Sequence, residues 1–186
     1  MNTVYSLPNL LTLMRILLIP VFVVVFYIPV HWAHTAAAFI FAFASVTDWL
    51  DGYLARRLEQ MSPFGAFLDP VADKLLVATS LLLLVGGKDI NYITIPAIVI
   101  VGREIVISAL REWMAELGKR TSVTVSYIGK VKTTLQMLAI FLLLAFYPTV
   151  SYWGVLGFIL LYLSAILTIW SMIIYLMIAW PQLVDK

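Results

Sequence analysis

The chain has 186 residues, of which 63% are hydrophobic and 12% charged, and its formal net charge is +2. Soluble domains use only about 45–50% apolar residues, so this composition excludes an ordinary soluble fold and predicts an integral membrane protein. The small net charge gives no reason to expect a nucleic-acid partner, and the absence of cysteine excludes disulfides and thiol chemistry. The start, MNTVYSLPNLL, lacks the basic segment of a cleavable signal peptide.

Six segments are long and apolar enough to be membrane-spanning helices, since a span needs about 20 mostly apolar residues. In chain order they are residues 8–30, 33–57, 65–86, 92–117, 127–147 and 152–179. Pro8 suits the first turn of a helix, and Gly86-Gly87-Lys88-Asp89 and Pro148-Thr149 separate later segments. No repeat divides the chain, so we expect one all-α membrane domain over residues 1–186.

Basic residues are unevenly distributed among the connections between these segments. Those near the second-to-third and fourth-to-fifth connections are Arg56, Arg57, Lys119, Arg120, Lys130 and Lys132. The opposite connections hold only Lys88 and two histidines. The positive-inside rule therefore predicts that both termini are cytoplasmic, as an even number of spans requires.

Two pairs of aspartates stand near the connection between the second and third segments. Asp48 and Asp51 are three residues apart in TDWLDGYLARR, and Asp69 and Asp73 are four apart in FGAFLDPVADK. Each spacing places a pair on one helix face. Because the connection is short, the two helices should be antiparallel neighbours, and the four carboxylates should converge near the cytoplasmic end.

Clustered carboxylates in a low-dielectric setting take up protons or bind a cation. Oxygen ligands favour magnesium, calcium or manganese, and two such ions can clamp the oxygens of a phosphoryl displacement. The spacing alone equally allows a proton or cation pathway in a transporter. Gly52, Ala55 and Gly65 leave room beside the carboxylates, although small residues also serve helix packing. Arg56 offers a fork of donors to a phosphate, and the combination favours a diphosphate site over a channel.

The full pattern is Asp48-x2-Asp51-Gly52-x2-Ala55-Arg56-x8-Gly65-x3-Asp69-x3-Asp73. It resembles the signature of the CDP-alcohol phosphotransferases, which are membrane enzymes of phospholipid synthesis, and all eight fixed positions have the expected spacing. The six-span plan and the chain length also resemble that family. The resemblance suggests a homodimer and implies a multi-pass protein of the bacterial inner membrane, with its active site on the cytoplasmic side among membrane lipids.

The resemblance also implies a reaction, in which an acceptor hydroxyl attacks the phosphorus attached to a CDP-linked lipid and CMP leaves. By family pattern the metal ligands are Asp48, Asp51, Asp69 and Asp73, and they would hold two Mg²⁺ or Mn²⁺ ions. Asp73 is also the expected general base. The expected nucleotide contacts are Asn9, Thr12, Gly52, Ala55, Arg56, Ser62 and Gly65. Asn9 and Thr12, with Arg15, recur every three residues as a polar ribbon on the first helix.

The acceptor must be inferred from the second half of the chain. Arg103 lies well inside an apolar run, where an arginine usually faces the bundle interior with a partner. Arg103, Arg111 and Lys130 could form an anion pocket, and such a pocket favours an acceptor that carries phosphate. For Lys132 a role in topology is as plausible as binding.

Glycerol 3-phosphate and inositol phosphate both satisfy a cationic acceptor pocket. The segments REIVISALREWMAELGK and GKVKTT resemble the bacterial members of the family that make phosphatidylglycerophosphate. We therefore expect CDP-diacylglycerol and glycerol 3-phosphate as substrates. A divalent-cation transporter that uses the four aspartates is the alternative from a different class, but it leaves Gly52, Arg56 and the polar ribbon unexplained.

Overall fold

The computed structural model describes residues 7–57, 62–87, 92–116, 127–146 and 151–184, apart from the side chains of residues 49, 54–56, 127–128 and 181–184. This described part contains α-helices and no strand, which confirms the predicted all-helical architecture. The six helices are α1 (Leu7–Phe26), α2 (Ala33–Arg57), α3 (Pro63–Gly86), α4 (Thr94–Glu116), α5 (Tyr127–Ala145) and α6 (Tyr152–Val184).

The end of α1 differs from the prediction, because the helix stops at Phe26 and not at residue 30. Pro29 disfavours a helical backbone in the residue before it. The amides of Tyr27 and Ile28 accordingly donate to carbonyls three residues back, on Val24 and Val25, each at 3.2 Å. Pro29 and these tighter hydrogen bonds therefore end the first helix one turn earlier than its apolar composition indicates.

The start of α3 is fixed by a capping residue. Ser62 has an extended backbone, and its hydroxyl accepts a hydrogen bond from the amide of Gly65 at 3.0 Å. Pro63 occupies the first helical position, where its missing N–H costs nothing. This cap sets where the helix that carries Asp69 and Asp73 begins.

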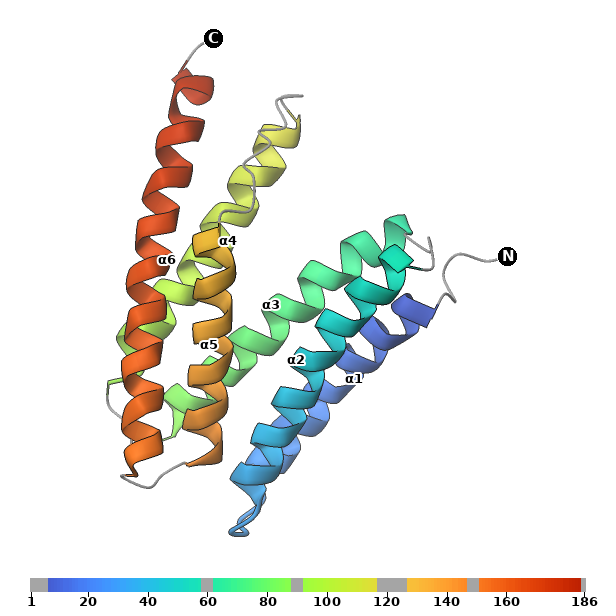
Figure 1. Ribbon diagram of the computed structural model, residues 1–186, viewed down its shortest axis with the longest axis vertical. Helices are drawn as coiled ribbons and strands as arrows, with labels where there is room; N and C mark the ends of the chain where they lie inside the picture. The colour runs from blue at the N-terminus through green and yellow to red at the C-terminus, as the bar shows by residue number, and fades with distance from the viewer. Residues whose placement is uncertain (1–6, 58–61, 88–91, 117–126, 147–150, 185–186) are drawn as a thin grey trace.

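The helices form two groups (Figure 1). In the first group α1 packs against both α2 and α3, and in the second α6 packs against both α4 and α5. The contact between α2 and α5 joins the groups, with smaller contacts from α3 to α4 and α5. The carboxylate-bearing helices α2 and α3 thus belong to one group, and the cation-bearing helices α4 and α5 to the other.

One continuous apolar core runs between these helices. Phe22, Phe41, Leu81, Ile100 and Leu144 are among its fully buried members. Where α5 meets α6 the backbones approach closely, since a Cβ added at Gly157 would lie 3.3 Å from the carbonyl oxygen of Ala139. Small residues at such positions allow membrane helices to pack tightly.

Three described helical segments are long and apolar enough to cross a membrane, namely Leu7–Phe26, Ala33–Tyr53 and Tyr152–Trp180. Large apolar side chains also face outward, as Leu17, Leu82 and Trp170 show with 70%, 69% and 61% exposure. Such a surface suits lipid and would be costly in water. These features support the membrane assignment.

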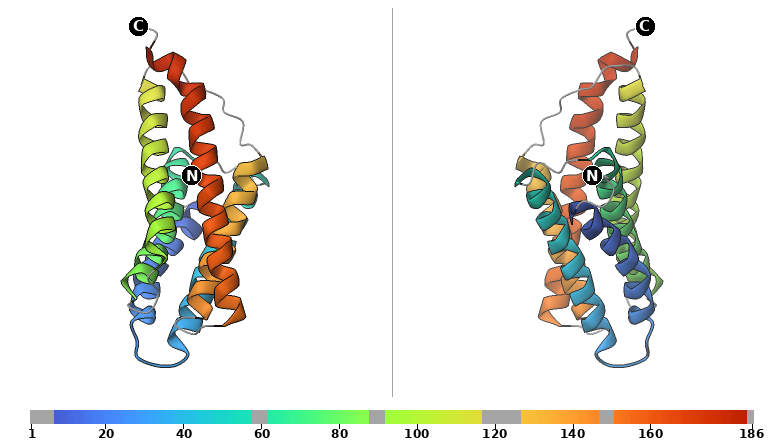
Figure 2. Two further views of the ribbon diagram at one scale, coloured as in Figure 1. Left: turned by 90° about the vertical axis from the view of Figure 1, so that its left-hand side faces the viewer. Right: turned by 90° about the vertical axis from the view of Figure 1, so that its right-hand side faces the viewer.

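One end of the bundle gathers the starts of α1, α3 and α5 and the ends of α2, α4 and α6 (Figure 1). Figure 2 shows that α4 and α6 reach beyond the start of α5 at this end. The aspartates of α2 and α3 and the basic residues Arg111 and Lys130 therefore come from the same end of the molecule.

Candidate active site

The predicted carboxylates come from two neighbouring helices, near the end of α2 and the start of α3. Asp48 and Asp51 lie one turn apart on α2, and Asp51 is 3% exposed. Asp69 and Asp73 lie one turn apart on α3. The two pairs therefore lie on antiparallel helices, as the spacing predicts. The predicted convergence of all four carboxylates on one ion is a separate question, because Asp73 approaches from another side.

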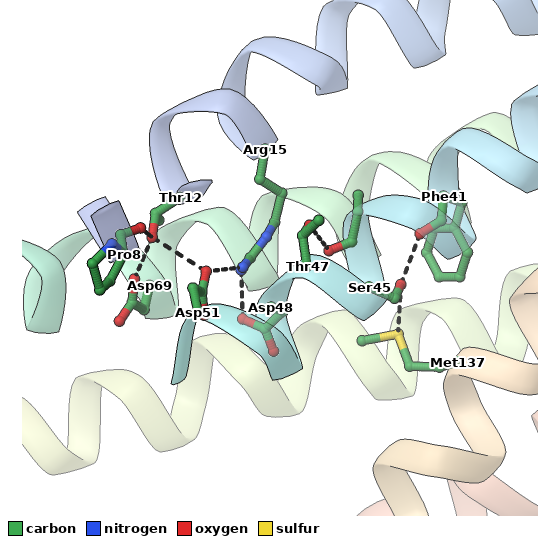
Figure 3. Close-up of polar contacts among 11 residues, drawn as sticks. Pro8, Thr12, Arg15, Phe41, Ser45, Thr47, Asp48, Asp51, Asp69 and Met137 are labelled. Carbon is green, nitrogen blue, oxygen red and sulfur yellow. Dashed lines mark hydrogen bonds and ion pairs between the residues drawn. The ribbon is translucent and has the colours of Figure 1, made fainter. Parts of the chain in front are cut away.

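Helix α1 supplies hydrogen-bond donors to three of these aspartates (Figure 3). The hydroxyl of Thr12 lies 2.7 Å from Asp69 Oδ1 and 3.4 Å from Asp51 Oδ2. The guanidinium of Arg15 forms ion pairs with Asp48 Oδ1 and Asp51 Oδ2. Thr12 and Arg15 are both fully buried. Asp48, Asp51 and Asp69 therefore meet around one face of α1.

Asp73 faces the same region from a different direction. Asp73 and Asp48 line one cleft of about 540 Å³ between α2 and α5. Its other lining residues are Phe41, Ala42, Ser45, Val46, Thr133, Thr134, Met137, Leu138 and Phe141. The cleft is mostly apolar, with the two carboxylates and the threonine hydroxyls as its main polar groups. It gives Asp73 access to a molecule that enters between α2 and α5.

The donor set has the chemistry of a site for a hard divalent cation, because carboxylate oxygens are the ligands that Mg²⁺ and Mn²⁺ prefer. Asp48 and Asp69 each accept from α1 through Oδ1, which is one of the two oxygens that a carboxylate offers. In the described part of the chain, no three acidic or histidine side chains are grouped closely enough to hold a single ion together. The residue types therefore fit a divalent cation. Thr12 of α1 contacts Asp51 and Asp69, and Arg15 of α1 contacts Asp48 and Asp51.

Three predicted nucleotide contacts instead join the start of α1 to the start of α3. The amide of Asn9 donates to Ser62 Oγ at 2.9 Å, and Ser62 Oγ lies 3.0 Å from Asn9 Oδ1. A Cβ added at Gly65 would lie 2.5 Å from Asn9 Oδ1. The room that Gly65 leaves is therefore filled by Asn9. A nucleotide role for these residues stays a prediction, beside this structural role.

The remaining nucleotide predictions fall on the last turns of α2. Gly52 follows the buried Asp51 directly. The side chains of Ala55 and Arg56 lie outside the described residues. Their roles therefore stay predictions.

A group of charged residues joins α4 to α5. Arg103 pairs with Glu104 at 2.5 Å, and Lys132 Nζ lies 3.7 Å from the same carboxylate oxygen. Lys132 is 3% exposed, whereas the prediction had chosen Lys130. The sequence held a signal for this, because Lys132 begins a helical stripe that continues through the buried residues Gln136, Ala139, Ile140 and Leu143. Lys130, two residues earlier, is on another face and is exposed.

The contacts in the structure give the three predicted acceptor residues different surroundings, and their shared pocket stays a prediction. Arg111 is exposed and turns toward α6, where its Nε donates to the hydroxyl of Tyr175 at 3.3 Å. Its guanidinium also lies 5.6 Å from the centre of the Tyr175 ring. The cation that accompanies Arg103 is Lys132, on the adjacent helix.

Long apolar helices and carboxylates beside a mostly apolar cleft define a class, that of helical membrane proteins with a polar site near one end. The model of the CDP-alcohol phosphatidyltransferase family matches residues 5–170, and the chain belongs to this family of transferases. Members of the family generally depend on a divalent metal.

Curated relatives are similar along almost the whole chain. A protein of Pseudomonas fluorescens is 56% identical over 179 residues, which cover 96% of this chain and 92% of the relative. A protein of Escherichia coli (strain K12) is 55% identical over 184 residues, covering 98% and 99% of the two chains. Both are named CDP-diacylglycerol--glycerol-3-phosphate 3-phosphatidyltransferase.

Proposed function

We propose that this protein transfers the phosphatidyl group of CDP-diacylglycerol to glycerol 3-phosphate, giving phosphatidylglycerophosphate and CMP. The family match and the names of relatives at 55–56% identity support this assignment. We propose further that all six helices span a bacterial inner membrane, with both termini and the active site on the cytoplasmic side. A homodimer stays a prediction.

The cleft between α2 and α5 is the observation that best supports a lipid donor. Asp48 and Asp73 lie among its lining residues, and Phe41, Leu138 and Phe141 supply apolar walls. A diacylglycerol linked to a charged diphosphate has the same combination of polar and apolar parts. The acyl chains would lie along the cleft, and the diphosphate would face the carboxylates, with Gly52, Ala55 and Arg56 on the last turns of α2 as nucleotide contacts.

The reaction forms a bond between the acceptor oxygen and the phosphatidyl phosphorus and breaks the bond from that phosphorus to the oxygen that leaves with CMP. Asp48, Asp51, Asp69 and Asp73 would hold the cation, which when bound neutralises phosphoryl charge and aligns the reacting oxygens. Asp73 would accept the proton of the acceptor hydroxyl. Asp73 lines the cleft, and a general base must be able to reach its substrate.

Arg103 and Lys132 are the best-placed groups for the phosphate of the acceptor. Both lie within 4 Å of Glu104 Oε1, at 2.5 and 3.7 Å, so their charges converge on one point. Two cations that converge on one oxygen also suit a phosphate oxygen. Arg111 and Lys130 are exposed at the same end of the bundle and would attract the anionic acceptor over a longer range.

An assay that compares acceptors, one in each reaction, tests the assignment. Full-length protein in detergent, with Mg²⁺ or Mn²⁺, receives CDP-diacylglycerol and one acceptor at equal concentration: glycerol 3-phosphate, inositol phosphate or serine. We expect CMP release and phosphatidylglycerophosphate formation with glycerol 3-phosphate, and neither in excess EDTA. A protein that binds the metal but releases no CMP with any acceptor would falsify the enzyme assignment.

The same assay separates the two alternatives. Faster CMP release with inositol phosphate would keep the family reaction but change the acceptor. A transporter that uses the four aspartates would carry divalent cations into liposomes without any nucleotide. Neither alternative has support from the relatives, whose names specify glycerol 3-phosphate.

A further inference from the structure

Arg15 is a buried residue to which the proposed reaction gives no role. Its side chain is 0% exposed, although α1 is one of the most apolar helices of the molecule. A buried membrane arginine is costly unless partners satisfy it. Its two terminal nitrogens reach two different carboxylates, because Nη1 contacts Asp48 and Nη2 contacts Asp51.

The geometry of these contacts restricts the carboxylates. The planar guanidinium presents its two N–H groups in a fixed fork, so its bonds to Asp48 Oδ1 and Asp51 Oδ2 set how the two carboxylates are turned relative to each other. Thr12, one turn earlier, approaches Asp51 Oδ2 and Asp69 Oδ1 from the same face of α1. Each bond occupies one oxygen and leaves the carboxylate its other oxygen as a ligand.

We propose that Arg15 is a positioning residue for the cation site, which turns Asp48 and Asp51 so that their second oxygens face a common divalent ion. The inference rests on the cation site of the proposed function but not on the identity of the acceptor. It assigns Arg15 to the metal ligands themselves and not to the nucleotide. Donors that orient metal ligands from behind commonly change metal affinity by 10- to 100-fold when they are removed.

Charge and geometry predict opposite effects at this position. Removal of a positive charge beside two carboxylates strengthens cation binding by simple electrostatics. Loss of the fork weakens binding, because the ligands are no longer aimed. Arg15→Lys separates the two effects, since it keeps the charge but has a single ammonium that cannot reproduce the two parallel bonds.

Mn²⁺ titration tests the proposal, with free Mn²⁺ followed by electron paramagnetic resonance on the full chain in detergent, without nucleotide. We expect Arg15→Lys to weaken Mn²⁺ binding roughly 10-fold. Arg57→Lys is the matched control, because Arg57 is exposed and its side chain contacts Tyr53 on its own helix. A thermal melt in EDTA checks that each variant is folded.

If Arg15→Lys does not fold, Mn²⁺ binding is measured in Arg15→Gln. It should also weaken Mn²⁺ binding, in spite of the lost positive charge. Unchanged or tighter Mn²⁺ binding in a folded Arg15 variant would overturn the proposal, as would a wild-type protein that binds no Mn²⁺. CMP release from CDP-diacylglycerol by the wild-type protein is measured separately. It shows whether the proposed function holds when the role of Arg15 does not.

Discussion

The hydroxyl of Thr12 on α1 lies 2.7 Å from Asp69 Oδ1 on α3, and the same oxygen of Thr12 lies 3.1 Å from the carbonyl of Pro8. One hydroxyl proton serves one acceptor at a time, and the shorter distance to a charged group favours Asp69. A residue expected to touch the nucleotide thus contacts a proposed metal ligand.

Thr12→Val removes this donor and keeps the shape of the side chain. We expect a loss of roughly 10- to 100-fold in kcat/KM for CDP-diacylglycerol, because a hydrogen bond to a charged group contributes about 1.5–3 kcal/mol. Thr12→Ser keeps the hydroxyl and should restore most of the activity. Steady-state CMP release measures both variants, and normal activity in Thr12→Val would show that the hydroxyl is not needed.

Gly65→Ala should lower stability, because the added Cβ would lie 2.5 Å from Asn9 Oδ1. Overpacking of this kind costs about 1–3 kcal/mol, and a thermal melt in detergent measures it. The double variant Asn9→Ala, Gly65→Ala removes the obstructing atom, so its loss should be smaller than the sum of the two single losses.

Gly102→Ala is the matched control for that experiment. A Cβ at Gly102 meets nothing within 4 Å, and Gly102 is also inside a helix. Alanine is about 1 kcal/mol better than glycine there, so this variant should be neutral or slightly more stable. Equal destabilisation at both positions would contradict the steric explanation for Gly65.

Lys132→Met should raise the KM for glycerol 3-phosphate roughly 10- to 100-fold, because it removes one of two cations that converge near Glu104. A charged contact of this kind contributes about 1.5–3 kcal/mol. Lys130→Met carries the same chemical change at an exposed position and should alter that KM much less. Initial rates at varied glycerol 3-phosphate and saturating CDP-diacylglycerol give both values. The reverse order would restore the original prediction of Lys130.

Asp73→Asn should reduce kcat by orders of magnitude and leave CDP-diacylglycerol binding largely intact, because an amide cannot accept the acceptor proton. Glu116→Gln, at an exposed carboxylate near the end of α4, is the charge-matched control and should keep normal turnover. Turnover and lipid-nucleotide binding are measured on the same preparations. Normal kcat in Asp73→Asn would rule out Asp73 as the base.

Apolar runs and turn residues predicted the six helices in order, because a membrane solvent makes composition a strong signal. Helix ends were less predictable, since the residue before Pro29 and the cap at Ser62 act through local geometry. The helical spacing of Asp48, Asp51, Asp69 and Asp73 predicted their pairing on two antiparallel helices, and the structure bears out that arrangement.

The contacts of α1 were not predictable in the same way. The ribbon of Asn9, Thr12 and Arg15 was visible in the sequence, but its partners depend on how α1 rotates against α2 and α3. Arg111 and Lys132 show the same limit. The side chain of Arg111 meets Tyr175 of α6, which the spacing within α4 did not indicate. The choice between Lys130 and Lys132 needed the facing direction of α5.

Helix α2 carries half of the carboxylates and also forms the main contact with the second group of helices, where Ser45 Oγ lies 3.9 Å from Met137 Sδ on α5. The carboxylates and the Arg103–Lys132 pair therefore belong to the two groups of helices that this contact helps to join. In the proposed reaction, the packing of α2 against α5 would set the distance between the acceptor and the phosphatidyl phosphorus. Met137 lies in this contact and also lines the cleft, so a change in its size would act on helix packing and on the proposed lipid site together.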